Sequence, residues 1–310
     1  MTAPAPGAPQ PGEIGSRALV AELTQLLGAG ARHEARFIVD EVLAGGEGVR
    51  RREVVPAAAA EAARAMAARR AAGEPLQYVF GHWPFRDLDL RVDPRVLIPR
   101  PETEQVVEVA LGEARHLAAQ RPGRRLIAVD AGTGSGAIAL ALASALGAAV
   151  LQEVWAVDRS VDALEVAACN VAAWRATATA DPRPEVQLAR GSWLGALPVH
   201  LRGRVDLVVS NPPYVTADEW AELTAEVKAE PYDALVAGPG REGTAGLADV
   251  EAVLGDARDW LARPGVVVVE LAPAQADAAR ALAQQLGYDE GRVEPDLAGR
   301  PRALVARLGA

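Results

Sequence analysis

The sequence predicts an α/β protein in which a small helical domain precedes an open, doubly wound sheet. Three observations indicate this fold class. From Arg124 onward, apolar segments rich in β-branched residues alternate with helix-forming segments, which is typical of a parallel sheet covered on both faces. A glycine-rich turn joins the first such strand to the first helix. Before this region, leucine and alanine residues recur at helical spacing.

The N-terminal region, residues 16–74, is predicted to form a few short helices divided by Gly and Pro residues. An alanine-rich run covers residues 57–72 and favours helix. One helical face is expected to carry Leu19, Leu23, Leu26 and Leu27. Residues 1–15 are rich in Ala, Pro and Gly, so we expect them to form a disordered tail.

Residues 75–98 are predicted to form a β-hairpin that links the two domains. Leu88, Leu90 and Val92 alternate with charged residues, and aromatic side chains cluster just before them. Alternation with period two in an aromatic-rich segment indicates paired strands. The sheet domain then occupies residues 99–310.

The sheet domain is predicted to contain seven strands. They lie near 125–130, 153–158, 185–190, 204–210, 265–270, 288–293 and 302–308. Helices are expected near 136–147, 160–175, 246–262 and 274–286. Because the last two strands are close in sequence, we expect them to form an antiparallel pair.

The composition argues against several classes of function. Cys169 is the only cysteine, which excludes an internal disulfide and favours a reducing, cytoplasmic location. The four histidines lie far apart, so no metal site is expected. A net charge of -9 argues against a protein whose main affinity is for nucleic-acid phosphates. No run approaches about 20 apolar residues, so no membrane span is expected.

The first motif that carries chemistry is VDAGTGSGAIALALA, which runs from Val129 to Ala143. An apolar strand ends at Asp130, and the glycines that follow would let a ligand approach the backbone with no Cβ in its way. A second acid, Asp158, ends the next strand about 28 residues later, where a carboxylate can accept both hydroxyls of a ribose. Asp158 could instead cap the following helix. At this point NAD and S-adenosylmethionine fit equally well.

The motif NPPY, Asn211 to Tyr214, follows the fourth predicted strand. Its prolines cannot donate to a sheet ladder and therefore fix a turn at the strand end. The Asn211 side-chain oxygen and the Pro212 carbonyl can each accept a hydrogen bond from a planar –NH2 group, and Tyr214 can lie flat against that group. Methyl transfer to an amide or exocyclic amine nitrogen uses these features, whereas hydride transfer does not. S-adenosylmethionine is therefore the expected cofactor.

The energy of the amide bond limits what NPPY can do. Abolishing amide conjugation would cost on the order of 18–20 kcal/mol. Two hydrogen bonds supply far less. The site is therefore expected to act by orienting the amide and by hydrogen bonds that strengthen in the transition state. The leaving group is a neutral thioether, so no general acid is needed.

Five segments together resemble a known family: EPLQYVFGHWPF, LIPRPETE, DAGTGSGAIAL, AVD and SNPPYV. They are similar to the protein-(glutamine-N5) methyltransferases of the HemK/PrmC type, which modify peptide chain release factors. The resemblance runs from about Leu19 to Leu308. It implies a Rossmann-like methyltransferase domain, an N-terminal domain that helps to grip the release factor, and the glutamine of the Gly-Gly-Gln loop as target. A cytoplasmic monomer with neither a nucleic-acid substrate nor a membrane partner is expected.

The resemblance also assigns roles to matching positions. The cofactor would be held by Asp130, Gly132, Thr133, Gly134, Ser135, Gly136, Asp158, Ser192, Trp193 and Asn211. The glutamine would be held by Asn211, Pro212, Pro213 and Tyr214, of which Asn211, Pro212 and Tyr214 would be catalytic. Arg100, Pro101 and Glu102 would line the entrance near the cofactor, and Arg100 and Glu102 would contact the substrate. From the residues alone, this last segment could also be a helix start, with Pro101 in its first turn.

The chain departs from the family pattern at three places. Ser192 stands where an acid usually precedes the tryptophan, the family's arginine before Glu230-Pro231 is displaced, and the segment Gly238 to Gly246 is looser. A methyltransferase for a ribosomal-protein glutamine shares NPPY and the glycine loop, although LIPRPETE favours release factors. An adenine-N6 DNA methyltransferase would need a basic region that reads DNA. A non-catalytic binding module is supported by Ser192 alone.

Overall fold

The computed structural model describes residues 13–44, 54–177, 182–240 and 246–309. The chain divides into two compact units. One contains the described residues up to Gly81 together with Ala225–Ala229, and the other contains His82–Thr224 and the described residues from Glu230 onward. No helix among these residues is both long and apolar enough to cross a membrane.

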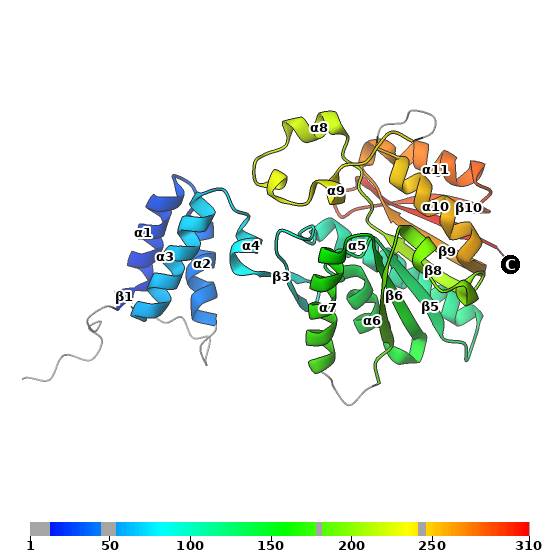
Figure 1. Cartoon of the computed structure of the whole chain (residues 1–310), viewed down its shortest axis with the longest axis horizontal. Coiled ribbons are helices and arrows are strands. Elements are labelled where there is room, and N and C mark those ends of the chain that lie inside the picture. The colour runs from blue at the N-terminus through cyan, green and yellow to red at the C-terminus, as the bar shows by residue number, and fades with distance from the viewer. Residues whose placement is uncertain (1–12, 45–53, 178–181, 241–245, 310) are drawn as a thin grey trace, which may run out of the picture. The chain divides into compact units, whose positions relative to one another are not determined.

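The first unit is a small helical bundle of α1 (Ser16–Leu27), α2 (Arg32–Ala44), α3 (Ala57–Ala71) and the short α4 (Leu76–Phe80) (Figure 1). Its core contains Leu19, Leu23 and Ile38. In α3 the alanines at helical spacing, Ala60, Ala63 and Ala67, face this core. Small side chains there let the helices approach closely. Leu26 does not join this core, because its side chain is 51% exposed in the last turn of α1.

Two short strands complete the helical unit. β1 (Ile14–Gly15) pairs antiparallel with β2 (Val54–Val55). Regular structure therefore begins at Ile14, which lies within the segment expected to be a disordered tail. Residues 1–12 of that tail lie outside the described part of the chain.

The predicted hairpin is present but shorter than expected. β3 (His82–Phe85) pairs with β4 (Leu88–Arg91), which places Trp83 opposite Leu90. The residues just before it form α4 instead of a strand. Gly81 ends α4 in the left-handed conformation that favours glycine, with φ 80°. The boundary between the units falls at Gly81, within residues 75–98, the segment expected to link the two domains.

The second unit contains a seven-stranded sheet with the order β10-β11-β9-β8-β5-β6-β7. The strands are β5 (Leu126–Ala131), β6 (Leu151–Asp158), β7 (Glu185–Arg190), β8 (Val205–Ser210), β9 (Leu261–Glu270), β10 (Glu290–Pro295) and β11 (Pro301–Leu308). Strands β5 to β9 pair in parallel, whereas β11 is antiparallel to both β9 and β10. The predicted antiparallel final pair is confirmed.

Helices cover both faces of this sheet (Figure 1). One face packs against α5 (Pro101–Gln120), α6 (Ala137–Val150) and α7 (Val161–Ala176). The other packs against α10 (Ala248–Trp260) and α11 (Ala276–Gln285). The predicted doubly wound α/β class is confirmed. Helix α5 is the main element that the strand and helix prediction missed.

The topology also locates the expected binding edge. The chain order reverses on either side of β5, which lies between β6 and β8. In open α/β sheets, ligands bind outside the carboxyl ends of the strands at such a point. The glycine-rich turn follows β5, Asp158 ends β6, and NPPY follows β8, so all three motifs meet there.

Candidate active site

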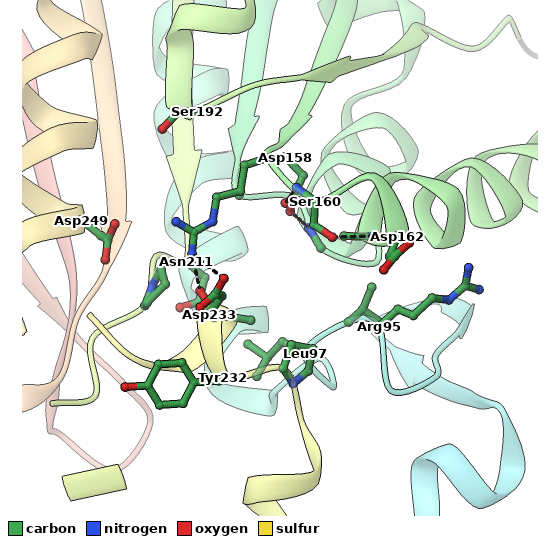
Figure 2. A pocket seen from close by; sticks show the side chains of 18 of the residues that line it. Arg95, Leu97, Asp158, Ser160, Asp162, Ser192, Asn211, Tyr232, Asp233 and Asp249 are labelled. Carbon is green, nitrogen blue, oxygen red and sulfur yellow. Dashed lines mark hydrogen bonds and ion pairs between the residues drawn. The ribbon is translucent and has the colours of Figure 1, made fainter. Parts of the chain in front are cut away.

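A cavity of about 690 Å³ opens at the carboxyl ends of β5, β6 and β8 (Figure 2). This volume lies within the range of small-molecule sites. The predicted residues that line it are Gly132, Gly134, Asp158, Ser192, Trp193, Asn211 and Pro213. Leu97, the first residue of LIPRPETE, also lines it, as do Arg95, Tyr232 and Asp249, which the sequence analysis did not single out. The glycine loop, the second acid and NPPY therefore share one cavity.

The glycine loop is held close to β6 by its backbone. The Gly132 and Thr133 amides both donate to the Val157 carbonyl, at 2.9 and 2.8 Å. Gly132 and Gly134 have φ of 80° and 53°, which favours glycine, and a Cβ on Gly132 would lie 3.4 Å from the Trp193 ring. The loop therefore exposes bare backbone toward the indole.

Asp130 supports the loop from beneath. The buried carboxyl accepts hydrogen bonds at Oδ2 from the Thr133 hydroxyl and the Ala139 amide. Its Oδ1 has no hydrogen-bond partner among the described residues. Burial raises the pKa of Asp130 to about 7. Asp130 does not line the cavity, and neither do its loop neighbours Thr133, Ser135 and Gly136.

Asp158 connects the end of β6 to the glycine loop. Its Oδ2 accepts from the Gly134 amide and its Oδ1 from the Ser160 amide, both at 2.9 Å. The N-cap of α7 is Ser160, whose hydroxyl accepts from the Ala163 amide. The alternative in which Asp158 itself caps the helix is therefore wrong, and its carboxylate faces the cavity (Figure 2).

Ser192 and Trp193 follow β7 and line the same cavity as the glycine loop. Trp193 adopts φ 46°, an uncommon conformation for a residue other than glycine. Its indole is half-buried beside Gly132, whereas Ser192 is exposed and its side chain caps no helix. The position that usually carries an acid thus offers only an exposed hydroxyl to the cavity.

NPPY follows directly from the last residue of β8. Asn211 and Pro213 line the cavity, whereas Tyr214 and the buried Pro212 do not. The Tyr214 amide donates to the Leu235 carbonyl, which fixes the end of the motif. Burial, with the nearby Glu270 charge as the next cause, raises the pKa of Tyr214 to about 12. The phenol therefore stays neutral at physiological pH.

Gly246 packs directly against NPPY. A Cβ at this position would lie 2.4 Å from the Tyr214 carbonyl oxygen and 2.6 Å from Gln275 Nε2, and its φ is 70°. Gln275 Nε2 itself donates to the Tyr214 carbonyl at 3.3 Å. Gly246 closes the segment that the sequence analysis described as loose, of which residues 241–245 lie outside the described part of the chain.

Comparisons with known proteins identify the family. Residues 17–81 match the family model of the PrmC N-terminal domain. The release factor glutamine methyltransferase of Streptomyces coelicolor is 38% identical over 293 residues, which cover 93% of this chain and 96% of that protein. The chain belongs to the release factor glutamine methyltransferase family. The recognition made from the motifs is confirmed.

Two further similarities accompany this assignment. The release factor glutamine methyltransferase of Gloeobacter violaceus is 40% identical over 235 residues, which cover 74% of this chain and 73% of that protein. A methyltransferase from Pyrococcus furiosus superimposes with a TM-score of 0.47 and 18% identity, covering 73% of this chain and 91% of that structure.

S-adenosylmethionine is the methyl donor of this methyltransferase family, and the cavity residues fit it. A nucleoside cofactor needs a loop without side chains and an acid at the end of the second strand. Gly132 and Asp158 provide both on one wall, and the Trp193 ring supplies an apolar surface opposite.

The segment LIPRPETE starts α5 of the methyltransferase unit. Arg100 is the N-cap, Pro101 is the first helical residue, and Glu102 lies in the first turn, so the predicted helix start is confirmed. The guanidinium of Arg100 pairs with buried Glu230, which also accepts from the Ile98 amide at 2.9 Å. Neither Arg100 nor Glu102 lines the cavity. Their expected place at the substrate entrance stays a prediction.

Two buried residues behind Asn211 escaped the sequence analysis. Asn211 Nδ2 lies 3.2 Å from Thr103 Oγ1, and Thr103 Oγ1 lies 2.7 Å from Glu270 Oε2. Thr103 belongs to LIPRPETE, and Glu270 ends the apolar strand β9 as Asp158 ends β6, while Asp130 is the next-to-last residue of β5. A search for acids that end predicted strands would have found Glu270.

Proposed function

We propose that this protein transfers a methyl group from S-adenosylmethionine to the side-chain nitrogen N5 of the glutamine in the Gly-Gly-Gln motif of peptide chain release factors. One observation carries the proposal. Asn211 of NPPY lines the same cavity as Asp158 and the glycine loop, so an amide and a nucleoside cofactor can meet there. Membership of the release factor glutamine methyltransferase family supports the choice of substrate.

The cofactor half of the cavity would hold S-adenosylmethionine, which supplies an electrophilic methyl group. The glycine loop would contact the methionine part and Asp158 the ribose, while Trp193 would lie along the adenine. Asp158 already accepts two backbone hydrogen bonds, and each carboxylate oxygen can accept more than one. Ser192 would offer its hydroxyl near the adenine in place of a carboxylate, at a cost of about 1–2 kcal/mol in cofactor affinity.

The amide half would bind the glutamine side chain. The Asn211 side-chain oxygen and the Pro212 carbonyl would accept the two N–H groups of the amide, and the Tyr214 ring would pack against its plane. The rigid prolines keep both acceptors in place before the substrate arrives, which lowers the entropic cost of orientation. As the nitrogen becomes tetrahedral and takes over the positive charge of the sulfonium, its N–H groups become more acidic, so both hydrogen bonds strengthen in the transition state. The neutral thioether leaves, and the methylated nitrogen then loses one proton to solvent.

The helical unit would help to bind the release factor. Its match to the PrmC N-terminal domain supports this role. We propose that the enzyme acts as a cytoplasmic monomer on the protein substrate, without a nucleic-acid partner. A glutamine of a ribosomal protein is the main alternative target, because NPPY and the glycine loop would serve it equally well.

The decisive experiment incubates the purified protein with S-adenosylmethionine and a release factor, followed by mass spectrometry of the Gly-Gly-Gln peptide. We expect one added methyl group on the glutamine. A release factor in which this glutamine is replaced by alanine is the matched control and should gain none. Methylation of ribosomal proteins with none on the release factor would favour the alternative target. Failure to bind the cofactor would favour a non-catalytic binding module.

A further inference from the structure

Three side chains from three separate elements form a hydrogen-bonded line that ends at the cavity. Asn211 follows β8 and lines the cavity, Thr103 lies in the first turn of α5, and Glu270 is the last residue of β9 (Figure 2 shows Asn211 at the cavity). Thr103 and Glu270 are 4% and 1% exposed. They cannot touch a substrate in the cavity, so any contribution to its chemistry would pass through Asn211.

The direction of these bonds determines which way the Asn211 amide faces. A threonine hydroxyl has one proton to donate, whereas an ionised carboxylate can only accept. When Glu270 is ionised, the Thr103 hydroxyl therefore donates to Glu270 Oε2 and accepts from Asn211 Nδ2 with a free lone pair. With the Asn211 nitrogen held on this side, its oxygen is directed away from Thr103.

We propose that Glu270 and Thr103 are positioning residues that hold Asn211 in the one amide orientation whose oxygen can accept from the methyl-accepting nitrogen. This inference rests on the proposed function. An asparagine amide has nearly the same shape in both orientations, so packing alone distinguishes them poorly. In the reversed orientation the Asn211 –NH2 would face the glutamine –NH2, and two donors would meet without an acceptor.

The surroundings of Glu270 explain how the donors and acceptors in this line of hydrogen bonds can exchange roles. Charged and titratable groups near this carboxyl are Arg302 from β11, Arg100 and Glu102 from the start of α5, and Tyr214 from NPPY. Glu270 Oε1 has no hydrogen-bond partner among the described residues. Burial raises the pKa of Glu270 to about 7. When protonated, Glu270 can donate to Thr103, whose hydroxyl then becomes free to donate to the Asn211 oxygen.

A pair of variants at residue 103 tests the proposal by kinetics. Thr103→Val keeps the shape but removes the hydroxyl, so we expect kcat to fall about tenfold, the effect of losing one well-placed hydrogen bond. Thr103→Ser keeps the hydroxyl and should restore kcat to within about twofold of the wild type. The dissociation constant of S-adenosylmethionine, measured by calorimetry, should change little in either variant. Wild-type kcat in Thr103→Val would overturn the proposal.

The amide orientation can also be observed without turnover. Asn170 and Asn211 are the only two asparagines of the sequence, so protein labelled with 15N-asparagine gives two side-chain –NH2 signals. Asn170 donates to the carbonyls of Arg91 and Ser135 and serves as an internal control. The signal that disappears in Asn211→Ala belongs to Asn211, and the remaining signal belongs to Asn170. We expect Thr103→Val to shift the Asn211 signal and speed its proton exchange with solvent, whereas Thr103→Ser preserves both.

The two readouts separate this inference from the proposed function. In one outcome, the wild type leaves release factors unmodified while Thr103→Val shifts the Asn211 signal and speeds its proton exchange. That result would contradict the proposed substrate and support the line of hydrogen bonds. If the wild type methylates the factor while Thr103→Val changes neither kcat nor the Asn211 signal, the positioning role is wrong. Glu270→Leu provides a second variant, and a wild-type kcat and Asn211 signal there would also contradict the role.

Discussion

The two halves of the cavity are built in different ways. In the cofactor half, the glycine loop and Asp158 lie within one β5-α6-β6 segment and are joined by a short-range hydrogen bond, and only Ser192 and Trp193 come from further along the chain, after β7. The amide half is assembled over long distances in sequence, since Asn211 meets Thr103 across 108 residues and Thr103 meets Glu270 across 167. Local segments encode the first half, whereas the packing of the whole unit creates the second. The two halves should therefore respond separately to substitution.

The largest expected effect is the loss of turnover in Asn211→Ala. Removing one group that strengthens its hydrogen bond in a transition state typically costs about 100-fold or more in kcat. Cofactor affinity should change little, because the other residues of the cofactor half remain. Rates of methylation and calorimetry of S-adenosylmethionine binding check both statements. An unchanged rate would contradict the proposed role of NPPY.

The next largest effect concerns pH and the buried acid of the amide half. The pKa of Glu270 is raised to about 7, so between pH of about 4.5 and 7 the folded state keeps a proton that the unfolded state has lost. The free energy of unfolding should therefore fall as pH rises through this window, by on the order of 3 kcal/mol from this group. Glu270→Gln should flatten the fall, as denaturant unfolding at pH 5 and pH 8 would show.

Asp130 offers the matched case in the cofactor half. Its pKa is also raised to about 7 by burial, so Asp130→Asn should flatten the same pH dependence in the same direction. Each variant removes one of two similar contributions, and the double variant should remove both. A pH profile that neither variant alters would show that these carboxyls do not control it.

Asp158→Ala should produce the opposite pattern to Asn211→Ala. Loss of charge-assisted hydrogen bonds to a ribose costs roughly 1.5–3 kcal/mol, so the dissociation constant of S-adenosylmethionine should rise about 10- to 100-fold. At saturating cofactor, kcat should fall much less. Wild-type affinity by calorimetry would refute the role of Asp158, and an equal loss in kcat would show that the halves are coupled.

The smallest effect compares two glycines. A Cβ at Gly246 would meet the Tyr214 carbonyl at 2.4 Å, so Gly246→Ala should lower the free energy of unfolding by about 1–3 kcal/mol and displace NPPY. Gly255 lies within α10 with nothing within 4 Å of its Cβ position. Gly255→Ala should therefore stabilise the protein by about 0.5–1 kcal/mol. Equal effects at both positions would contradict the close contact.

The difference between the halves also explains what the sequence could predict. The glycine loop, Asp158 and NPPY were found because each is a short motif at the end of an apolar strand, where spacing alone places it. Thr103 and Glu270 were missed because no local pattern shows that a helix start and a strand end meet behind Asn211. The same reason applies to Glu230, whose partners Arg100 and Ile98 lie about 130 residues earlier.

The secondary structure was likewise predictable where a local sequence pattern determines it. All seven strands of the sheet were predicted close to their observed ranges. The central parallel strands β5 and β8 were clearest, because buried parallel strands are continuous apolar runs. Helix α5 was recognised only at its start, since charged residues interrupt its apolar face. Residues 76–80 were assigned to a strand because their aromatic side chains favour one. Pro75 and Gly81 bound a short helix there instead, and these end signals outweigh the propensity of the residues between them.

The separation of Ser160 from Asp158 has an evolutionary consequence. Because Ser160 is the N-cap of α7, the carboxylate two residues earlier is not needed to cap the start of the helix. Substitution of Ser160 by another capping residue such as Thr or Asn can therefore accumulate as neutral drift. Asp158 cannot be replaced in this way, because its carboxylate accepts from the Gly134 amide and Asp158 also lines the cavity. Natural variants of this chain should therefore differ at Ser160 more often than at Asp158.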